Sequence, residues 1–258
     1  MPIKKSLANW FLSLAYSLLF CVQTLHIAFA SEVVSFPSLY DNTHLTAYLS
    51  QPVGSGPFPT VVLLHGCGGS NNINGIKSIY ASWAKLLNDN GMATLIVDSA
   101  GSRNLGATCV KGKNRIRMYR ERPFDAYGAL GYLQSLDIIQ PDKVGLLGWS
   151  QGGGVTLLSI VTESFARPVP APDHDFAVAA VFYPALCNDR MQSRPFTKRD
   201  PHSWSTKIPL LVLFGAADNW TRPEPCQAFI EEVQERGSPV SIVFIQTLIT
   251  VLMGQARS

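Results

Sequence analysis

The chain has 258 residues, of which 47% are hydrophobic and 15% are charged, and its formal net charge is +3 at pH 7. This near-neutral balance gives no reason to expect binding to nucleic acid or to an anionic membrane. The length and apolar content instead indicate one globular domain with a sizeable core.

The first 30 residues have the pattern of a secretory signal peptide. The basic pair Lys4 and Lys5 precedes an apolar run over about residues 10–22, and a small-x-small sequence ends at Ala30. The run is short for a membrane span, so we expect cleavage after Ala30 and export to the periplasm or the medium. The mature chain, 31–258, would keep 19 basic and 18 acidic residues and a net charge of +1. An uncleaved N-terminal anchor is the alternative.

Strands and helices alternate along the mature chain. Residues 32–50 predict a two-stranded opening, and a Gly- and Pro-rich loop follows. Apolar runs then predict strands at 60–65, 92–97, 144–149, 176–182, 209–214 and 239–244. Helical spacing predicts helices at 79–87, 123–136 and 223–236, with Pro123 near the first turn of the second, and a further helix from about 153 to about 163. The alternation indicates an α/β fold, with a mostly parallel twisted sheet covered by helices on both faces.

The strand at 144–149 leads into the pentapeptide Gly148-Trp149-Ser150-Gln151-Gly152, and a helix-capable stretch follows. In this strand–turn–helix context, a G-x-S-x-G sequence forms a sharp turn that exposes the serine hydroxyl above the sheet. The two glycines suit a turn that leaves no room for side chains. The context predicts that Ser150 is a catalytic nucleophile, and an ordinary turn is the alternative.

The segment His65-Gly66-Cys67-Gly68-Gly69 follows the strand at 60–65. In α/β-hydrolases an H-G sequence at this point supplies half of the oxyanion hole, and the residue after the nucleophile supplies the rest. We therefore expect the backbone amides of Cys67 and Gln151 to form this hole. A glycine-rich turn that only starts a helix is the alternative. A phosphate-binding loop is excluded, because the segment lacks G-K-[ST] and G-x-G-x-x-G.

Asp218 follows the strand at 209–214. A carboxylate at the C-terminal end of a strand can orient a histidine and stabilise its imidazolium. The order of Ser150 and then Asp218 matches α/β-hydrolases, so Asp218 is the candidate acid of a catalytic triad. A turn residue or a helix cap is the alternative.

The mature chain carries four cysteines: Cys67, Cys109, Cys187 and Cys226. An even number in an exported protein predicts two disulfides, with three possible pairings. We favour Cys67–Cys109 and Cys187–Cys226, because the members of each pair follow strands that we expect to be neighbours at one edge of the sheet. Four free, buried cysteines are the alternative. Their spacing with histidine does not suit a zinc site.

With these motifs the chain resembles the dienelactone hydrolase family of α/β-hydrolases, over nearly all of residues 32–244. The matching pieces are HGCGG at 65–69, the arginine-containing loop before Asp125-Ala126, GWSQGG at 148–153, FYP at 182–184 and GAADNWT at 215–221. The match looks closest to exported members with a serine nucleophile, whereas the better-known members use cysteine at the position of Ser150. The resemblance implies an α/β-hydrolase fold without a large lid domain. It also implies hydrolysis of small esters or lactones, without a metal or organic cofactor.

The family pattern continues after the last strand with a tyrosine-rich segment that contains His-Gly-Phe, and this chain departs from it there. No histidine follows Asp218 in the sequence. The five histidines all precede it: His26 lies in the signal peptide, His44 in the two-stranded opening and His65 in the oxyanion motif, whereas His174 and His202 lie in loops. Recruitment of His174 or His202 is the alternative. We therefore expect Ser150 to lack its base, and the chain as written to have very low turnover.

A lost nucleotide is a candidate explanation for this departure. Codons permitted for Phe244 to Met253, shifted by one nucleotide, encode Tyr-Pro-Asp-Ala-Tyr-His-Gly-Phe-Asp, which resembles the family pattern. The histidine would then fall where Thr250 now stands. The mature domain, 31–258, would accordingly be a C-terminally truncated hydrolase, with apolar surface uncovered near residues 248–252.

Two other classes of protein stay open. A non-catalytic binding protein on this fold would need no triad histidine. A serine peptidase of similar fold usually brings a large gating or propeller domain, and none fits within this length. The polar connection at 187–207 is also too short for a separate lid domain, so it predicts a loop over an open pocket for small esters or lactones.

Overall fold

The computed structural model describes residues 31–216, 218 and 221–246. Contacts divide the chain into residues 1–30 and residues 31–258, and all the described residues belong to the second unit. The expected signal peptide and the tail that contains Thr250 lie outside the described residues. Within the described part, no helix is both long and apolar enough to cross a membrane.

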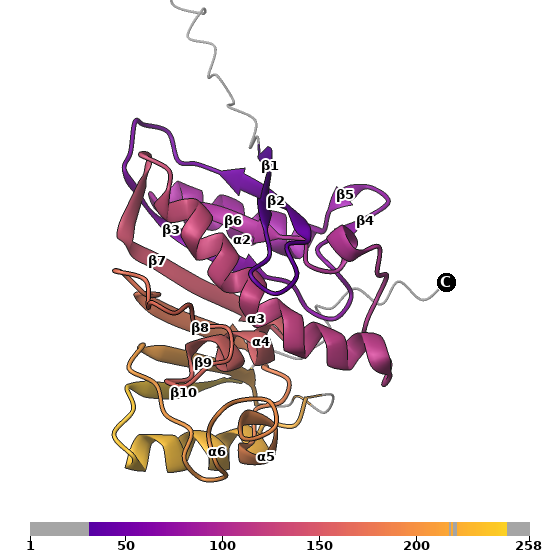
Figure 1. Cartoon of the computed structure of the whole chain (residues 1–258), viewed down its shortest axis with the longest axis vertical. Coiled ribbons are helices and arrows are strands. Elements are labelled where there is room, and N and C mark those ends of the chain that lie inside the picture. Colours follow the sequence, from indigo (N-terminus) through magenta and orange to yellow (C-terminus); the bar gives the residue numbers. More distant parts are fainter. Residues whose placement is uncertain (1–30, 217, 219–220, 247–258) are drawn as a thin grey trace, which may run out of the picture. The chain divides into compact units, whose positions relative to one another are not determined.

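One eight-stranded sheet forms the framework of the second unit (Figure 1). In spatial order its strands are β1 (Glu32–Pro37), β2 (His44–Ser50), β6 (Ala93–Val97), β3 (Phe58–Leu64), β7 (Ile139–Trp149), β8 (Val178–Phe182), β9 (Leu210–Gly215) and β10 (Val240–Ile245). β2 runs antiparallel to both of its neighbours, whereas the strands from β6 to β10 in this order run parallel. The mostly parallel sheet expected from the alternating sequence pattern is confirmed.

The register of the parallel strands brings their C-terminal ends to one edge of the sheet. Leu64 of β3 lies opposite Gly148 of β7, and Trp149 lies opposite Phe182 of β8. The segments that follow β3, β7 and β9 carry the candidate oxyanion residues, the candidate nucleophile and the candidate acid. The topology therefore brings all three motifs to the same edge, where α/β sheets bind their ligands.

Helices connect the parallel strands: α2 (Ser78–Asp89), α3 (Lys113–Gln134), α4 (Gln151–Ile160) and α6 (Glu224–Glu235). All five residues of β6 are buried, and so are the last six residues of β7. A strand is buried at consecutive positions only where both of its faces are covered. The structure thus confirms the expected cover of helices on both faces of the central sheet.

The second helix begins earlier than the sequence predicted. We expected Pro123 in its first turn, but α3 starts at Lys113 and holds Pro123 in its interior. The preceding stretch is rich in helix-forming residues and buries Met118 and Tyr119. This tertiary burial outweighs the backbone hydrogen bond that proline cannot make.

The sequence did not predict the shortest elements, because two to four residues are too few to show a periodic pattern. They are the hairpin of β4 (Asn71–Asn72) and β5 (Gly75–Ile76), the 3-10 turn η1 (Gly101–Arg103) and the single-turn α5 (Asp189–Gln192). α5 lies in the long connection at 187–207. The described residues contain no large lid domain, as the sequence predicted.

Candidate active site

Ser150 forms the sharp turn between β7 and α4. Its backbone angles, φ 50° and ψ −111°, lie outside the regions that L-residues normally occupy. Main-chain hydrogen bonds hold the turn: the Ser150 amide donates to the Phe182 carbonyl at 3.0 Å, and the Ala185 amide donates to the Ser150 carbonyl at 2.8 Å. Backbone strain of this kind persists only where the surroundings impose it, and it clusters at functional sites.

Gly148 and Gly152 flank Ser150 because neighbouring atoms leave no space for side chains. A Cβ atom on Gly152 would lie 2.0 Å from the carbonyl oxygen of Leu64, and one on Gly148 would lie 2.5 Å from the carbonyl oxygen of Gly152. Both distances are far below van der Waals contact. The start of α4 therefore lies directly against the end of β3, where the candidate oxyanion segment begins.

Thr108 joins the two segments that the sequence assigned to an oxyanion hole. Its amide donates to the Cys67 carbonyl at 2.7 Å, and its hydroxyl donates to Gln151 Oε1 at 3.0 Å. Gln151 is the first residue of α4, where backbone amides have no intrahelical acceptor. The Gly66 amide is already engaged, because it donates to the Tyr80 hydroxyl at 2.9 Å. The candidate amides of Cys67 and Gln151 thus belong to neighbouring segments that Thr108 links by hydrogen bonds.

Arg122 is fully buried at this junction. It lies in α3, where the sequence predicted an arginine-containing loop before Asp125, and no motif singled it out as a site residue. Its guanidinium donates to Gln151 Oε1 at 3.1 Å and to the His65 carbonyl at 2.8 Å. Burial lowers the pKa of Arg122 to about 10, so the side chain stays cationic at neutral pH. The cation ties the backbone leaving β3 to the residue after Ser150. The sequence gives little indication of this role, because Arg122 is one of several arginines in the same helix.

A buried ion cluster fixes the loop after β6 to α3. The Arg103 guanidinium donates to both carboxylate oxygens of Asp125 at 2.8 Å, and its Nε lies 2.8 Å from Glu121 Oε2. These two acids lie on either side of Arg122 in the sequence. The cluster therefore positions the part of α3 that carries Arg122.

Asp218 lies three residues beyond β9 and is 5% exposed. Its amide donates to the Gly215 carbonyl at 3.1 Å, and its Oδ1 accepts from the Thr221 amide at 3.0 Å. Burial, nearby Tyr80 and the charge of Asp218 together raise the pKa of Tyr183. Tyr183 directly follows β8, the strand between β7 and β9. The carboxylate therefore lies near the strand that separates it from Ser150.

The described histidines do not supply a base for Ser150. His65 is fully buried, with Nδ1 2.6 Å from the Gly66 carbonyl oxygen, and burial with the charge of Arg122 holds the pKa of His65 well below its usual range. His202 is exposed, and its Nδ1 lies 3.0 Å from Glu232 Oε2. His44 and His174 lie in β2 and in the loop before β8. Among the described residues, no histidine makes a hydrogen bond to Ser150.

Both expected cysteine pairs form disulfides, Cys67–Cys109 and Cys187–Cys226. The first ties the candidate oxyanion segment to the loop before α3. The second ties the connection after β8 to α6. The described part of the chain holds no cluster of three His, Cys, Asp or Glu side chains suited to a metal ion.

Comparison with known proteins gives a distant relative and many structures of the same fold. No protein-family model matches the chain. A curated protein from Bradyrhizobium sp., named "Probable 2-oxo-3-(5-oxofuran-2-ylidene)propanoate lactonase", is 25% identical over 194 residues, which cover 73% of this chain and 71% of that protein.

Three solved structures illustrate the shared fold. Thermogutta terrifontis esterase 2 phosphoramylated by tabun has a TM-score of 0.62 at 21% identity, over 85% of this chain and 84% of that one. The "Putative Dienelactone Hydrolase" from Klebsiella pneumoniae has a TM-score of 0.62 at 13% identity, over 85% and 87%. Porphyromonas gingivalis dipeptidyl peptidase 4 has a TM-score of 0.61 at 18% identity, over 87% of this chain but 33% of that one.

Proposed function

We propose that this chain, which has the α/β-hydrolase fold and resembles dienelactone hydrolases, is a serine hydrolase of small carboxylic esters or lactones, impaired in the form given by its sequence. The observation that carries the proposal is the strained turn at Ser150, closely packed at Gly148 and Gly152. The lactonase relative and the esterase and dienelactone hydrolase neighbours support the substrate class.

In the proposed reaction, Ser150 Oγ attacks the carbonyl carbon of the substrate. The amides of Cys67 and Gln151 donate to the oxyanion that develops. The tetrahedral intermediate collapses, the C–O bond to the alkoxy group breaks, and an acyl-enzyme remains that water hydrolyses. A base must accept the serine proton and return it to the leaving group. Asp218 would orient that base and stabilise its charge.

The segment after β10 is the place from which such a base would come. Ile245 lies opposite Gly215 of β9, and its carbonyl accepts from the Ala216 amide at 3.1 Å. The chain therefore leaves β10 beside the turn that carries Asp218. Ser150 follows β7, two strands from β9, which is a separation of about 10 Å across the sheet. A histidine held between them can contact both side chains.

This chain has no histidine in that segment, and a lost nucleotide near codon 244 accounts for it. The shifted frame reads Tyr-Pro-Asp-Ala-Tyr-His-Gly-Phe-Asp at positions 245–253, with the histidine in place of Thr250. The position of β10 beside the Asp218 turn supports this interpretation. The 3′ end of the gene tests it directly: codons that cannot encode the shifted segment would exclude a lost nucleotide, without affecting the assignment of Ser150.

A chain with residues 245–253 replaced by the shifted sequence, which we call the restored chain, tests the assignment of Ser150. We expect a fluorophosphonate to add to Ser150 in the restored chain, as read by intact mass and peptide mapping. The chain as given should react at least about 100-fold more slowly, because its serine stays protonated. A Ser150→Ala control should not react. Modification at another residue would overturn the assignment.

A non-catalytic binding protein on the same fold is the second candidate, and the missing histidine after Asp218 favours it. In that case neither folded chain reacts with the fluorophosphonate. The likeness to dipeptidyl peptidase 4 covers 33% of that protein and supports a shared fold only.

A further inference from the structure

A pocket of about 470 Å³ opens between α3 and the C-terminal end of α4, away from the candidate active site. Ser150 does not line it. Leu158, which does, lies eight residues further along α4, about 12 Å along the helix axis. The volume is within the range of sites for small organic ligands. The pocket is therefore large enough for a small ligand. Because Ser150 does not line it, such a ligand would bind independently of the hydrolase chemistry.

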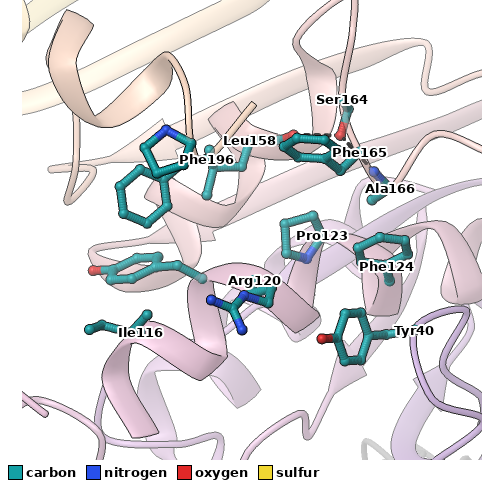
Figure 2. A pocket seen from close by; sticks show the side chains of 12 residues that line it. Tyr40, Ile116, Arg120, Pro123, Phe124, Leu158, Ser164, Phe165, Ala166 and Phe196 are labelled. Carbon is teal, nitrogen blue, oxygen red and sulfur yellow. Dashed lines mark hydrogen bonds between the residues drawn. The ribbon is translucent and has the colours of Figure 1, made fainter. Parts of the chain in front are cut away.

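The walls of this pocket are aromatic and aliphatic. Figure 2 shows side chains of α3 on one side of the pocket, among them Ile116, Arg120 and Phe124. On the other side are Leu158 of α4, Phe165 of the loop after α4 and Phe196 of the loop after α5. Tyr40 packs edge-to-face on Phe124 at the rim, with ring centroids 5.3 Å apart. Ile116 and Phe165 are 52% and 49% exposed, so the pocket presents apolar surface to solvent. Aromatic walls of this kind favour a planar, apolar ligand.

The charged side chain that lines the pocket is a cation. No acidic residue lines it, whereas Arg120 does, and Arg120 has no ion-pair partner within the described residues. Lys198 Nζ adds a second cation, 5.8 Å from the centre of the Phe165 ring. The neighbouring acids are engaged elsewhere: Glu121 with Arg103 and Arg117, Asp41 with the same two arginines, and Glu163 with Arg199. A ligand that complements this pocket carries an anion on an aromatic body.

We infer that this pocket is a second binding site, for a small aromatic carboxylate whose ring lies between Phe124, Phe165 and Phe196. Its carboxylate pairs with Arg120 at the rim. Tyr119 also lines the pocket, and a Cβ atom on Gly154 of α4 would lie 3.5 Å from its ring. An occupied pocket therefore contacts a residue that packs against the helix that begins after Ser150.

Binding of 2-naphthoate to the full chain, measured by ligand-observed NMR, tests the inference. The expected dissociation constant is about 1 mM or lower, the affinity typical of a ligand with this number of heavy atoms. The neutral isostere 2-naphthamide should bind at least about fivefold more weakly, and raising the salt should weaken only the carboxylate. Equal affinity of the two compounds would overturn the role of Arg120.

Substitutions at exposed residues locate the binding site without destabilising the fold. Arg120→Gln and Ile116→Glu should each weaken 2-naphthoate binding about fivefold or more. Lys143→Gln, which removes an exposed cation outside the pocket, should change it less than about twofold. Ser150→Ala should bind 2-naphthoate like the parent, because Ser150 does not line the pocket. Loss of binding in Ser150→Ala, or equal effects of Arg120→Gln and Lys143→Gln, would overturn the inference.

Discussion

Arg122 and Gln151 are joined by a buried hydrogen bond of 3.1 Å, which links a cation in α3 to the residue directly after the candidate nucleophile. The same guanidinium holds the His65 carbonyl at 2.8 Å. One side chain thus fixes the relative position of the two segments that we assign to the oxyanion hole.

Replacing Arg122 with methionine should lower the free energy of unfolding by about 2–3 kcal/mol. The substitution removes a guanidinium that donates to the buried Gln151 amide oxygen and leaves the buried His65 carbonyl with one donor fewer. Urea denaturation measures the change. Arg120→Met on the same helix is the matched control, since Arg120 is exposed, and its effect should stay within about 0.5 kcal/mol. Equal effects would show that the buried bonds of Arg122 contribute nothing.

Gly152→Ala should destabilise the fold by about 3 kcal/mol or more, because the new Cβ would lie 2.0 Å from the Leu64 carbonyl oxygen. Gly131→Ala is the control within a helix, where a Cβ meets no atom within 4 Å. That change should be neutral or stabilise by up to about 1 kcal/mol. A tolerated Gly152→Ala, judged by thermal unfolding, would contradict the close contact of α4 with β3.

Loss of the Cys67–Cys109 disulfide should cost about 4 kcal/mol of stability, as expected from the loop-closure entropy of a 42-residue separation. The Cys187–Cys226 disulfide has a similar separation of 39 and should contribute a similar amount. The two double-alanine variants differ in a second respect. In the restored chain, only the first should also slow fluorophosphonate labelling of Ser150, because only that disulfide anchors the candidate oxyanion segment. Equal labelling in both variants would contradict that role.

His202 should make stability depend on pH in a defined direction. The hydrogen bond to Glu232 and the charge of Asp189 raise the pKa of His202 above its ordinary value. Its contribution to stability is therefore complete below the unfolded pKa and is lost as pH rises through the folded pKa. The stability advantage of the parent over His202→Gln should shrink between about pH 6 and pH 8. An NMR titration provides the direct check: Glu232→Gln should lower the pKa of His202, and an unchanged value would contradict the pairing.

The fold was predictable where the sequence pattern is local and repeated. Apolar runs gave the strands of the parallel sheet, and the glycines around Ser150 gave the turn between β7 and α4. The predicted start of α3 is wrong. Pro123 is typical of a first helical turn, but the burial of Met118 and Tyr119 extends the helix back to Lys113. The contacts of Arg122 and Thr108 with Gln151 escaped prediction, since they join residues 29 and 43 positions apart. Such pairs leave no periodic or motif signal in one sequence.

Hydrolysis of p-nitrophenyl acetate by the restored chain and by the chain as given tests the assignment of Ser150 most directly. We expect kcat/KM of the restored chain to be at least about 10³-fold higher, and Ser150→Ala in the restored chain to remove the gain. Equal activity of the two chains, or a restored activity that survives Ser150→Ala, would contradict the assignment of Ser150 as the nucleophile of a triad completed from the segment after β10.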